Sequence, residues 1–187
     1  FVKIPFMIDS QNKETIEAAF QLMQGKGILN SVNLENDGKV LAELIPLVKL
    51  YGAAVIVGCI EKEMALTAQE KLAIASKAHK ILTETYGLEE ENIIFDPLVF
   101  PCATGDAKYV GSAKETIEGI RLIKERFPNC KTILGISNVS FGLPPAGRAY
   151  MNSVFLYECV NKGLDAAIIN VEKLIPENEI KAEEKQL

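Results

Sequence analysis

The chain has 187 residues, of which 48% are hydrophobic and 24% charged, a balance that predicts one soluble globular domain and excludes a disordered or fibrous protein. Its formal net charge is -5, with no long basic stripe, so a nucleic-acid backbone is excluded as a partner whereas a small anionic ligand is not. No apolar run reaches the ~20 residues of a membrane span and the first residues lack a secretory pattern, so we expect no membrane association and a cytoplasmic location.

Short apolar, β-branched runs alternate six times with longer stretches of helical period, which predicts one domain of βα units. The expected strands are Ile4–Ile8, Gly27–Leu29, Ala53–Ile60, Ile93–Phe95, Thr132–Ile136 and Ala166–Ile169. The expected helices cover residues 12–24, 38–51, 68–86, 112–127 and 147–162.

Residues that favour helix ends support these boundaries. Ser10, Thr67 and Ser112 are candidate N-caps, and a glycine follows three of the helices, at Gly52, Gly87 and Gly163. We expect the barrel domain to cover residues 1–176, and the charged residues 177–187 to form a solvated tail or linker.

Strands separated by helices form a parallel sheet, which can be an open doubly wound sheet or a closed barrel. Polar residues stand at the carboxyl ends of five different strands: Asp9-Ser10, Asn30-Ser31, Glu61, Asp96 and Ser137-Asn138. A barrel gathers all its strand ends around one mouth, whereas an open sheet binds ligands mainly at its switch point. The pattern therefore favours a (β/α)8 TIM barrel.

Such a barrel needs eight strands, and about six βα units are visible. Because the chain begins at Phe1, inside a unit, we expect the first two βα units to be absent from it, so that the barrel is truncated at its N-terminus. Open sheet edges would then need pairing, which makes a homo-oligomer possible.

Cysteine and histidine usage argues against a metal site. The four cysteines show no CxxC spacing, and His79 is the only histidine. We expect reduced cysteines, no metal in this chain, and a surface or packing role for His79.

Six segments resemble the pterin-binding region of cobalamin-dependent methionine synthases. In chain order they are Met7–Ser10, Ile28–Glu35, Phe95–Leu98, Ala103–Gly105, Gly135–Gly142 and Ile169–Leu174. Each segment alone is weak, but their order over residues 4–176 makes the resemblance specific. It implies a (β/α)8 barrel related to dihydropteroate synthase that transfers the N5 methyl group of 5-methyltetrahydrofolate to cob(I)alamin, which then methylates homocysteine to methionine.

The resemblance also implies roles for individual residues. Asp9, Asn30 and Asp96 correspond to residues that hold the pterin, with Ser31 beside them. Asn138 corresponds to the residue that reaches N5, and we take it as the catalytic residue. Arg148 and Ser137 are the further folate-binding candidates.

The chemistry of a pterin suits these residue types. Its edge presents an amino group and a ring N–H side by side, and a carboxylate such as Asp9 or Asp96 can accept both hydrogen bonds. The tertiary amine becomes a neutral leaving group only when N5 is protonated. An asparagine such as Asn138 can turn either its carbonyl or its amide toward N5, and so can serve both protonation states.

Each residue also has a simpler interpretation. Asp9 and Ser10 could cap the following helix, Asp96 before Pro97 could be a turn residue, and Arg148 could be a solvated arginine at a helix start. Asn30 and Asn138 could likewise be turn residues at strand ends.

The corrinoid-binding signature of this family is missing, because it has an Asp two residues before a His and a Gly three residues after, whereas Lys77 and Leu82 flank His79. We therefore expect cobalamin to be held by another domain, and the partners to be the corrinoid-binding and homocysteine-binding modules of a larger polypeptide.

Three alternatives stay open. One is a methyltetrahydrofolate:corrinoid protein methyltransferase of one-carbon metabolism, and another is a dihydropteroate synthase-like enzyme. The absence of a basic residue in Ser137–Ser140 argues against the second, because dihydropteroate synthases carry a Ser-Arg-Lys-like segment there. The third is an inactive structural fragment.

Overall fold

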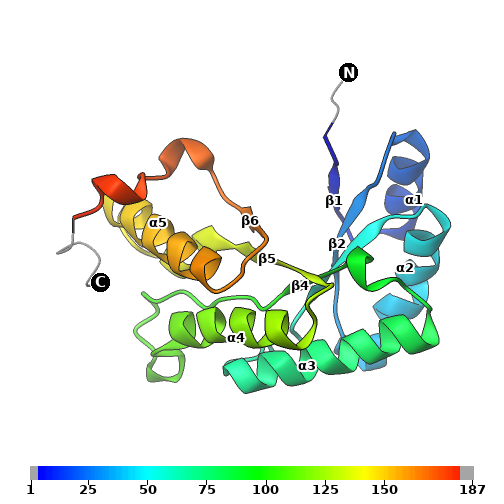
Figure 1. The fold of residues 1–187 in the computed structure, drawn as a ribbon, viewed down its shortest axis with the longest axis horizontal. Helices are drawn as coiled ribbons and strands as arrows, with labels where there is room; N and C mark the ends of the chain where they lie inside the picture. Colours follow the sequence, from blue (N-terminus) through cyan, green and yellow to red (C-terminus); the bar gives the residue numbers. More distant parts are fainter. Residues whose placement is uncertain (1–3, 182–187) are drawn as a thin grey trace.

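The computed structural model describes residues 4–181, and within them six strands alternate with five α-helices (Figure 1). The strands are β1 Met7–Asp9, β2 Ile28–Val32, β3 Ala54–Gly58, β4 Ile93–Asp96, β5 Lys131–Gly135 and β6 Ala166–Ile168. The helices are α1 Lys13–Leu22, α2 Lys39–Leu50, α3 Ala68–Lys80, α4 Ser112–Arg126 and α5 Pro145–Asn161.

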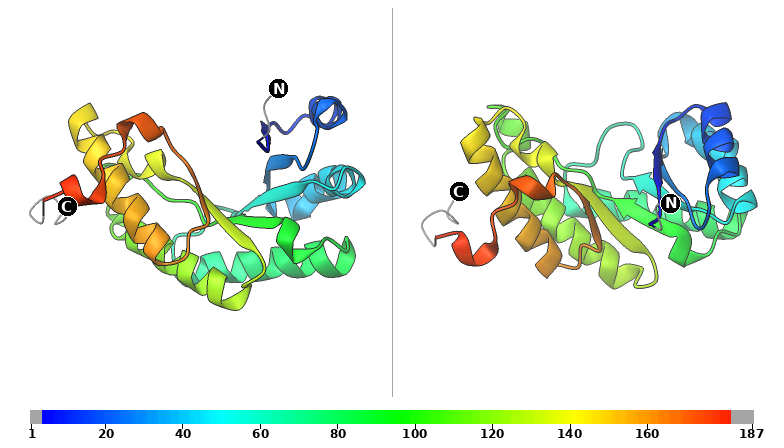
Figure 2. Two further views of the ribbon diagram at one scale, coloured as in Figure 1. Left: turned by 45° about the horizontal axis from the view of Figure 1, so that its top comes forward. Right: turned by 90° about the horizontal axis from the view of Figure 1, so that it is seen from above.

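All six strands are parallel, and their order in the sheet is the order of the chain, β1 to β6. A doubly wound sheet would reverse direction at a switch point, whereas a barrel adds each new strand on the same side. The sheet is curled, and the helices cover its outer side (Figure 2). The predicted barrel architecture is therefore confirmed, with six parallel strands and five intervening α-helices arranged as part of a (β/α)8-type barrel.

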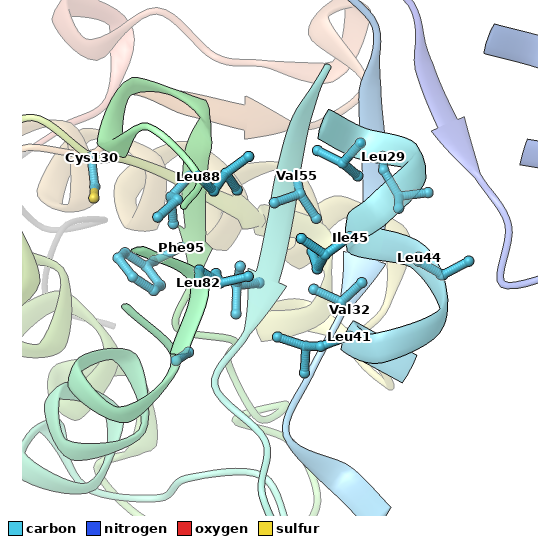
Figure 3. Packing of buried hydrophobic residues seen from close by; sticks show 14 of the residues in the cluster. Leu29, Val32, Leu41, Leu44, Ile45, Val55, Leu82, Leu88, Phe95 and Cys130 are labelled. Atoms are coloured by element: carbon cyan, nitrogen blue, oxygen red, sulfur yellow. The ribbon is translucent and has the colours of Figure 1, made fainter. Parts of the chain in front are cut away.

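The hydrophobic core has two layers. On the outer side of the sheet, residues of β2, β3 and β4 pack against α2, α3 and the segment after α3, as Figure 3 shows for Leu29, Val55 and Ile45. On the inner side, Ala54, Ile56, Ile94 and Ile133 form a separate cluster with Met7 and Ile28, and no helix residue belongs to it. The alternation of side chains along each strand thus fills both faces of the sheet.

Several predicted helix boundaries are confirmed and two caps are corrected. Thr67 caps α3, with Glu70 completing a capping box, and Gly52, Gly87 and Gly163 adopt positive φ as expected. Ser10 does not cap α1, because Asn12 does, and the Ser10 Oγ accepts a hydrogen bond from the Asn12 N–H instead. Ser112 is the first residue of α4 rather than its cap, which is Gly111.

Several expected segments are shorter than predicted, and the expected tail lies partly outside the described part. The third strand covers Ala54–Gly58, and the third helix is α-helical to Lys80 and continues as a π-helical turn over Ile81–Thr85. The first strand begins at Met7 rather than Ile4, whose side chain is exposed. In the expected tail, Glu177–Glu179 form a 3-10 turn and Ile180 is buried, while residues 182–187 lie outside the described residues.

Within residues 4–181, none of the helices combines the length and the apolar character that a bilayer crossing requires. β1 and β6 are the outermost strands of the sheet, and Ile168 of β6 is exposed.

Candidate functional site

Three of the predicted site residues share the inner face of the sheet. Asp9, Asn30 and Asp96 each stand two residues after a member of the inner cluster, Met7, Ile28 and Ile94 respectively. Because side chains alternate along a strand, a spacing of two puts each polar side chain on the same face as its apolar predecessor. The polar residues lie nearer the carboxyl ends, so they form a polar layer above the apolar one.

The strand register brings these residues next to one another. Asp9 is the direct partner of Asn30 across β1 and β2, and the Ser10 N–H donates to the Asn30 carbonyl oxygen at 3.2 Å. Asp96 pairs with Gly58 across β3 and β4. Gly58 has no side chain, and the position that its Cβ would take is in contact with the side chains of Leu98 and Ile60.

Asp96 is held by the turn that follows it. One carboxylate oxygen, Oδ1, accepts a hydrogen bond from the Leu98 N–H at 2.8 Å, and Leu98 has a φ of 58°. Burial raises the pKa of Asp96 from 3.8 to about 6, although the hydrogen bond from Leu98 and the charge of Lys71 both oppose this rise. Asp96 is therefore a turn residue, as the simpler interpretation held, and its Oδ2 has no hydrogen bond to this turn.

Lys71 is the functional candidate that the sequence analysis missed. It lies in α3 with 1% of its surface exposed, and its ammonium donates hydrogen bonds to the carbonyl oxygens of Ala65, Pro97 and Leu98. One sequence feature could have revealed it, because Lys71 occupies a position in the apolar stripe formed by Ala68, Ala75 and Ala78.

Asn138 lies in a 3-10 turn, Ile136–Ser140, that follows β5 directly. A Cβ placed on Gly135 would stand 3.1 Å from the Asn138 Nδ2. Gly135 is two residues after Ile133 of the inner cluster, so that Cβ would point to the inner face. The Asn138 amide therefore lies on the inner side of the sheet, the face that carries Asp96, and its side chain is exposed.

The loops after β4 and β5 are joined beside this residue. The Cys102 N–H donates to the Val139 carbonyl oxygen at 2.9 Å, and the Phe141 N–H donates to the carbonyl oxygen of Asn138 at 3.2 Å. These backbone hydrogen bonds hold the turn that presents Asn138.

Ser137 and Arg148 line a neighbouring cavity of about 490 Å³, together with Asn152, Asn170 and Lys173. The Arg148 Nε donates to the buried Ser140 Oγ at 3.2 Å, and this hydroxyl donates to the Ser137 carbonyl oxygen at 3.2 Å. Arg148 is thus tied to the Asn138 turn rather than freely solvated. The cavity is formed by α5 and the segments after β5 and β6, at the same end of the sheet as Asp96.

Ser31 is the remaining candidate. It lies between Asn30 and the buried Val32, within a shift of register between β2 and β3, and the Asn30–Ser31 peptide bond is cis. Its side chain is half-buried.

His79 lies away from these residues. It stacks on Phe127 with ring centroids 4.4 Å apart, and its Nε2 lies 2.6 Å from a Glu90 carboxylate oxygen. Glu90 immediately precedes β4, so His79 is at the amino end of the sheet, opposite to Asp96. Across residues 4–181, no three His, Cys, Asp or Glu side chains gather in a way that would hold a metal ion.

Comparisons with known proteins agree with the barrel fold. Residues 1–170 match the family model described as pterin binding enzyme. Over 98% of its length the chain is 41% identical to methionine synthase of Mycobacterium tuberculosis and 37% identical to methionine synthase of Mycobacterium leprae. It spans only 16% of the length of either relative. The chain therefore belongs to the pterin-binding enzyme family.

Proposed function

We propose that the chain binds 5-methyltetrahydrofolate at the carboxyl end of its sheet and transfers the N5 methyl group to cob(I)alamin, as one step in the methylation of homocysteine to methionine. The observation that carries this proposal is the shared inner face of Asp9, Asn30, Asp96 and Asn138, which come from three strands and one turn at the same end of the sheet. The similarity to methionine synthases supports a role in the synthesis of methionine.

The carboxylates recognise the pterin edge. A carboxylate accepts the paired N–H groups of the 2-amino group and the ring nitrogen. Asp96 suits this role because the Leu98 turn fixes its position and because it is largely shielded from solvent. Shielding from water strengthens a hydrogen bond to a ligand. Asp9 and Asn30, side by side, serve the remaining donors and acceptors, and Ser31 lies next to them.

Asn138 stabilises N5 as it becomes protonated. In the transfer, the bond between N5 and the methyl carbon breaks, and its electron pair stays on N5, so a proton on N5 avoids an anionic leaving group. The Asn138 carboxamide can present its oxygen to a protonated N5 or its NH₂ to a neutral one. Its exposed position on the inner face suits a group that must meet a ligand.

Arg148 and Ser137 contact the part of the folate beyond the pterin. Arg148 lies in a cavity next to the Asn138 turn and carries a permanent positive charge, which suits a carboxylate such as those of the glutamate tail. Cobalamin, held by another module of a longer polypeptide, would supply the nucleophilic cobalt that accepts the methyl group.

Titration calorimetry with 5-methyltetrahydrofolate tests the binding, and single-turnover methylation of added cob(I)alamin tests the transfer. We expect the chain to bind 5-methyltetrahydrofolate, and Asp96→Ala to weaken this binding at least tenfold. We also expect the chain to methylate the added cob(I)alamin although it does not itself hold a corrinoid. Condensation of a pterin pyrophosphate with p-aminobenzoate would instead indicate a dihydropteroate synthase. If neither folate nor pterin binds, the chain is inactive on its own and the proposal fails for it.

A further inference from the structure

We propose that Lys71 is a positioning residue for the pterin site, because its buried ammonium ties together the loops after β3 and β4 and holds Asp96 as an oriented carboxylate. The part of this inference that concerns pterin rests on the proposed function. The part that concerns Asp96 does not, and it can be tested without any ligand.

The Lys71 ammonium is saturated by backbone oxygens. Its Nζ lies 2.9 Å from the Ala65 oxygen, 2.7 Å from the Pro97 oxygen and 3.1 Å from the Leu98 oxygen. Three N–H groups thus meet three carbonyls, one in the loop after β3 and two in the loop after β4. An ammonium buried to this extent is costly unless every donor is satisfied, so an apolar residue would be the ordinary choice at this position.

The packing around the lysine stem keeps the ammonium in place. A Cβ on Gly119 of α4 would stand 2.9 Å from the Lys71 Cδ, so α4 leaves room for this side chain by carrying a glycine there. The neighbouring Thr116 donates from its Oγ1 to the same Leu98 carbonyl oxygen at 2.8 Å. The Leu98 carbonyl is therefore held from two helices at once.

The connection from Lys71 to Asp96 is only two residues long. The Leu98 N–H donates to Asp96, and its carbonyl accepts from Lys71, so one peptide segment transmits the position of the ammonium to the carboxylate. The positive φ of Leu98 is unfavourable for a bulky side chain, and the hydrogen bonds to its carbonyl oxygen help to hold it in this conformation. Without Lys71, the turn that orients Asp96 would lose two of its hydrogen bonds.

The charge of Lys71 acts on Asp96 as well. Among the acidic groups around Lys71, Glu70 accepts from the Leu66 and Thr67 N–H groups, and Glu115 accepts from the Ala68 N–H. Burial raises the pKa of Cys59 to about 12, so its thiol is neutral at physiological pH. Asp96 is therefore the site carboxylate that the Lys71 charge favours in its ionised form, against the effect of burial.

The first test measures the Asp96 carboxyl by ¹³C NMR titration of the unliganded chain, in the wild type, Lys71→Met and Thr116→Val. Methionine retains the apolar stem but removes the charge, and Thr116→Val removes a hydrogen bond to the same carbonyl without changing charge. We expect Lys71→Met to raise the pKa of Asp96 by about one unit, and Thr116→Val to leave it near the wild-type value. An unchanged pKa in Lys71→Met would overturn the electrostatic part of the proposal.

The second test follows 5-methyltetrahydrofolate affinity against pH. For Lys71→Met we expect the midpoint of the affinity profile to move up by about one unit, with partial recovery of affinity at high pH, and for Lys71→Arg a profile near that of the wild type. An equal loss at every pH would indicate a merely structural role. If Lys71→Met does not fold, Gly119→Ala displaces the ammonium instead, and an unchanged Asp96 pKa there overturns the proposal. A wild type that binds no folate refutes the proposed function while the NMR result still decides the role of Lys71.

Discussion

The Asn138 amide nitrogen lies 3.1 Å from the point where a side chain on Gly135 would begin. This approach is possible because β5 ends in a residue without a Cβ, so the turn after it can fold its carboxamide back over the inner face of the sheet. Gly135 has a negative φ, which means that the space it leaves, rather than backbone freedom, is what matters here. Gly135 and Asn138 thus act as a pair that sets where the carboxamide stands.

Replacing Gly135 by alanine tests this pairing. The added methyl would push the Asn138 amide by a few tenths of an ångström, so we expect about tenfold slower methyl transfer with folate affinity reduced less, because small misplacements cost rate before binding. Gly147→Ala is the matched control, since a Cβ there meets no atom within 4 Å. Equal transfer rates in the two variants would contradict the pairing.

Removing the carboxamide itself should separate rate from affinity. We expect Asn138→Ala to slow single-turnover methyl transfer about 100-fold, while the dissociation constant for 5-methyltetrahydrofolate changes only severalfold, because the contact strengthens as N5 gains its proton. Calorimetry and stopped-flow kinetics on the same samples measure both quantities. A loss of affinity larger than the loss of rate would remove Asn138 from the catalytic role.

Asp96→Asn should weaken folate binding and yet stabilise the unliganded protein. Burial raises the pKa of Asp96 to about 6 in the folded state, whereas the unfolded chain loses this proton near 3.8. Between these values the folded state binds more protons than the unfolded state, so the Asp96 contribution to the free energy of unfolding falls as pH rises. Above pH 6 the asparagine variant should be more stable by about 1 to 2 kcal/mol, given the partial exposure of the carboxylate.

Urea unfolding of wild type and Asp96→Asn at several pH values between 4 and 8 measures this difference. The stability gain of the variant should be small at pH 4 and should grow until about pH 6 to 7. A stability difference that does not depend on pH would show that burial does not destabilise the ionised Asp96 carboxylate.

His79→Gln should affect stability and leave the site unchanged. The variant loses the stack on Phe127, so we expect the free energy of unfolding to fall by about 1 kcal/mol. Folate affinity should equal that of the wild type, because His79 lies at the opposite end of the sheet. Lys80→Gln, at an exposed position of the same helix, is the control for helix stability, and a change of folate affinity confined to His79→Gln would contradict this assignment.

The positions of the strands and of the polar residues at their ends could be predicted from the sequence. Strand alternation and helical period can be recognised from a few neighbouring residues. For this reason Asp9 and Asp96 were expected at the ends of strands, and the structure places them there. The same local information was insufficient for the caps. Ser10 and Asn12 are both good N-cap residues, and the path of the chain leaving β1 decides for Asn12.

The amino-acid sequence by itself determined which residues of a strand share a face, since a period of two needs no knowledge of the fold, whereas the packing of the sheet decided which face is the inner one. Only the tertiary structure decided that Lys71 meets Pro97, 26 residues away, because such a contact depends on how whole βα units pack. A lysine in an apolar helical stripe indicates that its buried ammonium must find hydrogen-bond acceptors. The carbonyl oxygens that accept from Lys71 are near it only because the fold brings two loops together.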